Sequence, residues 1–172
     1  MTGPADLASI IRRLRRLEDE AAIRDLLSAY AFAADMSDAD RWLGLFTDDA
    51  FFAAPGLGRF EGRAAMRELI DQLLAHNEHV ANQHDPLGPL AVEIDGDTAR
   101  ADGYSLVLSA APGAKPVIDS VNLSRWTFVR RDDRWLISGR EVRSLDAAGL
   151  LSFAADGFGF RRVAGAVPPD IG

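Results

Sequence analysis

The chain has 172 residues, of which 48% are hydrophobic, enough to bury one sizeable core. Its 26 acidic and 19 basic side chains give a net charge of -7, and such a surface repels nucleic-acid phosphates and anionic lipid. The absence of cysteine excludes disulfides, thiolate metal sites and a cysteine nucleophile.

The first residues give no sign of export. Residues 1–17 lack the continuous apolar stretch of a signal peptide, and no segment approaches the roughly 18 apolar residues of a membrane span. The basic cluster Arg12-Arg13 with Arg15-Arg16 alternates with leucines, which indicates the wet side of an amphipathic helix rather than a nucleic-acid site. We therefore expect a cytoplasmic protein.

The first half of the chain has helical patterns. Apolar residues recur at three and four positions, the spacing of one helix face. Pro4 suits a helix start, and Pro55-Gly56 suits the end of a strand. In chain order we predict helical segments over 7–17, 23–34, 39–46 and 63–75, with one strand over 50–54.

The second half changes to strands. The apolar runs predict strands over 90–94, 98–110, 117–129 and 134–142. Turn formers at Asp95-Gly96-Asp97, Pro112-Gly113 and Arg131-Asp132-Asp133 suit antiparallel hairpins. Helices followed by a meander of long strands predict an α+β fold. We expect one domain over 1–150 and a tail over 151–172 that packs on the domain or on a neighbouring subunit.

Two polar residues occupy unusual positions in the second helical segment. Asp35 borders its buried face, where a carboxylate needs a partner or water, although it also suits the cap of the next helix. Tyr30 lies on the apolar face, as a core tyrosine or a catalytic one. Common phosphate, dinucleotide and hydrolase motifs are absent.

The three histidines, His76, His79 and His84, fall within nine residues. His76 and His79 close a helix, where the dipole favours a cation, so we predict no metal site. His84 enters the sheet half and suits a general base, because imidazole titrates near neutral pH. Arg140, on the last strand, points either inward or outward.

Several short segments together resemble the SnoaL-like branch of the nuclear-transport-factor-like superfamily. The resemblance runs from about Leu17 to Leu145. Its segments are Ala21-Ala22-Ile23-x-Asp25-Leu26, Tyr30, Asp35, Phe46-Thr47-Asp48-Asp49-Ala50, Gly62-Arg63, Asp95-Gly96-Asp97-x-Ala99 and Asp133-x-Trp135-x-Ile137 with Arg140.

The resemblance implies a cone-shaped barrel in which a bent antiparallel sheet wraps helices around a pocket. The members of the superfamily that this chain resembles most in pattern are cofactor-free lyases, namely scytalone dehydratase, hexachlorocyclohexane dehydrochlorinase and bile-acid 7α-dehydratase. It also implies an Asp35–His84 dyad, with Tyr30 and Arg140 beside the substrate. Relatives often have asparagine where this chain has Gly88, so substrate recognition does not transfer.

The resulting hypothesis is a lyase or isomerase that abstracts a proton from a small apolar cyclic substrate. No cofactor and no metal are expected, and the partners are that substrate and further copies of the chain in a homodimer or homotrimer. Alternatives are a non-catalytic binding protein, a polyketide cyclase, or an epoxide hydrolase using Arg100 and Asp102. The candidate substrate-binding residues are Trp42, Phe46, Phe51, Phe52, Asn122 and Trp126.

Overall fold

The computed structural model describes residues 6–77, 81–85, 90–110 and 113–145. The predicted tail over 151–172 lies outside these residues. The helices are α1 (Leu7–Asp35), α2 (Ala39–Leu43) and α3 (Gly62–Asn77). The strands are β1 (Phe46–Ala54), β2 (Gly58–Glu61), β3 (Ala81–Asp85), β4 (Ala91–Asp95), β5 (Thr98–Ala110), β6 (Val117–Arg131) and β7 (Arg134–Ser144).

The two helical patterns predicted over 7–17 and 23–34 form one continuous helix, α1. The Asp6 side chain caps it by accepting a hydrogen bond from the Ala8 N–H at 3.1 Å. No glycine or proline interrupts the helix, so nothing in its interior favours a break. At 100° per residue, the apolar side of the first pattern lies about 180° from that of the second. This change of side makes one helix look like two.

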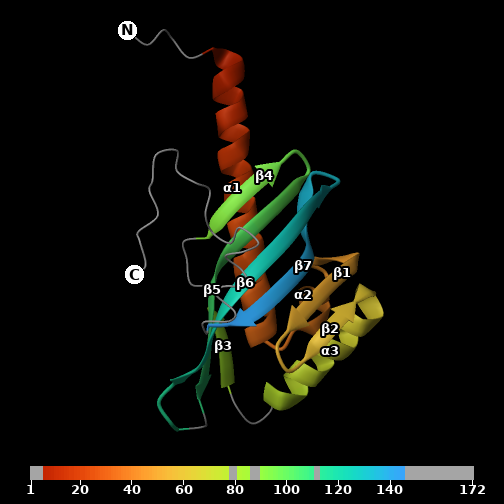
Figure 1. Cartoon of the computed structure of the whole chain (residues 1–172), viewed down its shortest axis with the longest axis vertical. Helices are drawn as coiled ribbons and strands as arrows, with labels where there is room; N and C mark the ends of the chain where they lie inside the picture. Colours follow the sequence, from red (N-terminus) through yellow and green to blue (C-terminus); the bar gives the residue numbers. More distant parts are fainter. Residues whose placement is uncertain (1–5, 78–80, 86–89, 111–112, 146–172) are drawn as a thin grey trace, which may run out of the picture.

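The strands form one sheet in the order β2-β1-β7-β6-β5-β3, and β4 pairs with the first half of β5 whereas β3 pairs with its last half (Figure 1). All pairs are antiparallel except β1 with β7, which is parallel. The predicted antiparallel sheet is therefore mixed. The short strands β2 and β3 had not been predicted, because neither carries a run of alternating apolar residues.

The core lies between the helices and one face of the curved, unclosed sheet, which confirms the predicted α+β fold. Along β6, Ser124, Trp126 and Phe128 are buried while the residues between them are partly exposed, the alternation of a strand with one covered face. Helix α1 contacts β3, β4 and β7, and α3 contacts β1 and β2. None of the described helices is long and apolar enough to cross a membrane.

Candidate functional site

The most unusual core residue is an arginine. Arg140 of β7 is only 7% exposed, on the same side of the sheet as Ile137. Residues three apart on a regular strand face opposite ways. The register between β6 and β7 shifts between the pairs Phe128–Ile137 and Thr127–Gly139, so that Ser138 is one extra residue on β7. This bulge reverses the alternation and turns Arg140 into the core.

The guanidinium of Arg140 donates hydrogen bonds to three hydroxyl groups. Its Nη1 lies 2.6 Å from Tyr30 Oη, and its Nη2 lies 3.2 Å from Ser124 Oγ and 3.3 Å from Ser105 Oγ. The two serine oxygens are 2.9 Å apart and share a hydrogen bond. We call Tyr30, Ser105, Ser124 and Arg140 the Arg140 cluster. The structure thus brings together two of the four predicted catalytic residues.

Aromatic rings surround this cluster. The Arg140 Cζ atom lies 4.4 Å from the Trp126 ring centroid and 5.5 Å from that of Phe52, within the range of cation–π attraction. The Tyr30 ring centroid lies 4.8 Å from Trp126, 5.6 Å from Trp42 and 6.0 Å from Phe46. Four of the six predicted substrate-binding residues therefore gather around Tyr30 and Arg140.

Within the described part of the chain, no carboxylate forms an ion pair with Arg140. Its Nε–H has no hydrogen-bond partner there, and neither do the buried indole N–H groups of Trp42 and Trp126. A buried charge is costly unless an opposite charge compensates it. As far as the described residues go, the site therefore combines one cation that has no paired carboxylate with several unused hydrogen-bond donors.

The proposed acid–base pair is only partly described. Asp35 is the half-buried last residue of α1. His84 belongs to β3, where its backbone pairs with Val107 of β5, two residues from Ser105. Helix α1 contacts β3, so the elements that carry Asp35 and His84 are neighbours. The His84 side chain lies outside the described part of the structure, and the dyad remains a prediction.

Of the two other predicted substrate-binding residues, Asn122 shares a face of the sheet with Ser105, its partner in register, whereas Phe51 does not. Asn122 of β6 is half-buried and donates to Ser120 Oγ at 3.0 Å. Phe51 lies between the buried residues Ala50 and Phe52 of β1. Its ring lies against Gly139, and the ring centroid is 3.9 Å from the guanidinium carbon of Arg59. Phe51 is therefore on the opposite face of β1 from Phe52, away from the rings that surround Arg140.

Sequence reasoning missed Ser105 and Ser124. Both are nearly fully buried and both bind Arg140. Small hydroxyl residues in strands are common, so neither has a distinctive local pattern. For Ser124 the only signal in the sequence was its position, two residues before Trp126, which places both side chains on the same face of the strand.

The residues of the epoxide-hydrolase alternative occupy the other face of the sheet. Asp102 pairs in register with Arg125, whereas the neighbouring Ala101 pairs with Trp126, which belongs to the core. The Asp102 carboxylate is 2.9 Å from Arg125 Nε and 3.2 Å from Arg100 Nη2. These ion pairs give Asp102 a structural role, on the opposite face from the Arg140 cluster.

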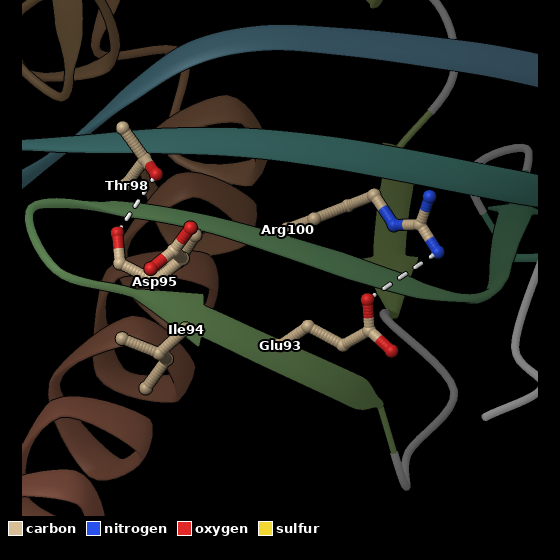
Figure 2. Close-up of a pocket in the computed structure, with 6 residues that line it drawn as sticks. Glu93, Ile94, Asp95, Thr98 and Arg100 are labelled. Carbon is tan, nitrogen blue, oxygen red and sulfur yellow. Dashed lines mark hydrogen bonds and ion pairs between the residues drawn. The ribbon is translucent and has the colours of Figure 1, made fainter.

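A groove of ≈ 480 Å³ lies at the β4–β5 hairpin, lined by Glu93, Ile94, Asp95, Thr98, Ala99 and Arg100. Figure 2 shows Arg100 directed toward Glu93, with 3.7 Å between Nη2 and Oε2, and the Thr98 hydroxyl bonded to the Asp95 carbonyl at 2.9 Å. This groove contains none of the four predicted catalytic residues. Among the residues the structure describes, no group of three or more acidic or histidine side chains is arranged to hold a metal.

Comparison with known proteins identifies the family. The model of the SnoaL-like domain matches residues 15–141. The chain belongs to the SnoaL-like domain family. This result confirms the resemblance seen in the sequence. Among curated proteins, no match to this SnoaL-like chain was found.

Several solved structures are similar to this chain over most of its length. An NTF2-like protein with a cystatin-like fold from Novosphingobium aromaticivorans is 35% identical, covers 87% of this chain and 97% of its own, and has a TM-score of 0.77. Rv3472, of unknown function, from Mycobacterium tuberculosis is 26% identical over 87% and 95% of the two chains, with a TM-score of 0.67. LinA is 25% identical over 78% and 90%, with a TM-score of 0.67.

Proposed function

We propose that this SnoaL-like protein is a cofactor-independent lyase or isomerase that removes a proton from a small cyclic substrate. The single observation that carries the proposal is the Arg140–Tyr30 contact, a buried guanidinium held by hydroxyls beneath aromatic rings. Such donors stabilise negative charge that develops on an oxygen or a leaving group during proton abstraction. The similarity to LinA, whose type 2 form is described as a hexachlorocyclohexane dehydrochlorinase, also supports this reaction class.

In the proposed mechanism, His84 is the general base. It removes a proton from a carbon next to a carbonyl or a leaving group, and Asp35 accepts the other imidazole N–H and stabilises the imidazolium. The packing of α1 on β3 supports this pairing, because it brings the two elements together. General acid–base catalysis of this kind contributes roughly 10²–10⁴-fold in rate.

Tyr30 and Arg140 have the electrophilic role in this mechanism. Tyr30 Oη accepts a hydrogen bond from Arg140, so its own proton is available for a substrate oxygen or a departing hydroxyl. The guanidinium supplies positive charge close to that oxygen, in surroundings of low polarity where it acts strongly. The rings of Trp42, Phe46 and Trp126 would hold the apolar part of the substrate.

The test is elimination from hexachlorocyclohexane and from cyclic β-hydroxy ketones, assayed by loss of substrate and appearance of the alkene. Asp35→Asn and His84→Ala should each lower kcat at least about 100-fold, in keeping with general base catalysis. Asp25→Asn is the matched control, because Asp25 is exposed on the same helix. Full activity in either dyad variant would overturn the mechanism, and binding without turnover by the parent protein would favour a binding role.

A further inference from the structure

The Arg140 cluster contains more hydrogen-bond donors than acceptors. Arg140 has five N–H groups and no acceptor, and its Nε–H has no partner in the described part of the chain. The Tyr30 hydroxyl accepts from Arg140 and keeps its own proton to donate. One hydrogen bond joins the hydroxyl groups of Ser105 and Ser124, so only one of their two protons is used in it and the other is available to donate. The indole N–H of Trp126, whose ring packs on Arg140, is also unpartnered.

Such a set requires an acceptor, and the charge requires an anion. Among the described residues, carboxylates such as Asp102 and Asp19 are paired with other arginines, Arg125 and Arg130. Arg140 is more than nine-tenths buried, so bulk solvent screens its charge poorly. A planar oxygen anion fits a guanidinium better than any other common group, because two parallel N–H donors match two oxygens.

We infer that the ligand of this site is a ring-bearing carboxylate, or a phenolate or enolate of similar size, whose oxygens bind Arg140, Tyr30 and the Trp126 indole. This inference rests on the proposed function for the location of the site, and it adds the chemical class of the substrate. The aromatic side chains around Arg140 would pack on the ring of such a ligand. The charge of Arg140, which has no carboxylate partner among the described residues, would pair with the ligand's anionic group.

The experiment measures binding, not turnover, in the Asp35→Asn variant, so that catalysis plays no part in the result. The probes are 2-naphthoate, 2-naphthol and 2-naphthamide, titrated by calorimetry above and below the pKa of 2-naphthol. We expect the carboxylate to bind at least about tenfold more tightly than its neutral amide. If 2-naphthol gains affinity only when ionised, the phenolate is the better ligand.

Arg140→Met should abolish the preference for the anion, and Arg140→Lys should retain part of it. If Arg140→Met does not fold, Ser124→Ala is the second variant, expected to lower carboxylate affinity severalfold through loss of one group that orients the guanidinium. Equal affinity for 2-naphthoate and 2-naphthamide in the Asp35→Asn variant with Arg140 intact would overturn the inference. That result would leave the proposed proton transfer untouched, whereas tight anion binding without any turnover would contradict only the proposed function.

Discussion

Tyr30 Oη and Arg140 Nη1 lie 2.6 Å apart although 110 residues separate them in the chain. Tyr30→Phe removes the hydroxyl and leaves a buried N–H without a partner, which should cost about 1–3 kcal/mol in the free energy of unfolding. It should also lower kcat in the elimination assay, because the mechanism gives the phenol proton to the substrate. Urea unfolding and the elimination assay measure the two effects, and unchanged kcat would contradict the role of Tyr30.

Arg140→Met should separate stability from function. Replacing a buried ion pair by apolar side chains of similar volume is often neutral or stabilising by about 1–4 kcal/mol, and Arg140 has no carboxylate partner among the described residues that the change would leave unpaired. We therefore expect unfolding free energy to stay the same or rise while anion binding and turnover are lost. A loss of more than about 3 kcal/mol would mean that the hydroxyl partners and rings already compensate the charge within the protein.

Asp19 links α1 to the last hairpin. Its carboxylate accepts hydrogen bonds from Arg130 Nη1 at 2.7 Å and Nη2 at 2.9 Å, and from Trp135 Nε1 at 3.0 Å. Asp19→Asn should therefore cost about 2 kcal/mol of unfolding free energy, within the range for hydrogen bonds to charged groups. Urea unfolding measures the loss, with Asp25→Asn as the exposed control on the same helix.

The pH dependence of that loss follows from Arg130. The hydrogen bonds to Asp19 raise the pKa of Arg130 above its ordinary value, although burial opposes the shift. A raised folded-state pKa gives stability that is present below the unfolded pKa and is lost only as pH rises through the folded one. The difference in unfolding free energy between the parent protein and Asp19→Asn should therefore stay constant from about pH 6 to about pH 9. A difference that fell across this range would contradict the assignment.

Gly139 allows Phe51 to lie flat on β7. A Cβ at this position would lie 2.2 Å from the Phe51 ring, which is held under Arg59. Gly139→Ala should therefore destabilise the protein by about 1–3 kcal/mol through overpacking. In the background of Phe51→Ala the same change should cost much less, and a double-mutant cycle by thermal unfolding measures the coupling. Additive effects would show that the ring moves aside freely.

Most of the fold was predictable from local patterns, and the exceptions have physical reasons. The long strands β5, β6 and β7 begin where the sequence predicted them, because Asp95-Gly96-Asp97 and Asp132-Asp133 suit tight turns. The parallel pairing of β1 with β7 joins residues about ninety positions apart, and no local pattern contains that information. The apolar residues of α1 likewise change from one side of the helix to the other, which is why the sequence pattern predicted two helices instead of one.

The site was predictable in its residue types but not in its geometry. Resemblance to the family selected Tyr30 and Arg140, and the structure brings them into contact. The direction of Arg140 depends on the extra residue at Ser138, which reverses the alternation of β7 and has no signature in sequence. Phe51 and Phe52 looked equivalent as neighbouring aromatics, whereas a strand necessarily sends them to opposite faces.

The position of β7 between β1 and β6 has a consequence for synthesis. The strand made last among those described fills a gap in the middle of the sheet, and it carries the guanidinium that joins Tyr30 to the two serines. While a ribosome is still making residues 134–144, strands β1 and β6 both present unpaired edges. The nascent chain therefore has neither a continuous sheet nor the Arg140 cluster until those residues emerge, and during that interval its open edges favour aggregation.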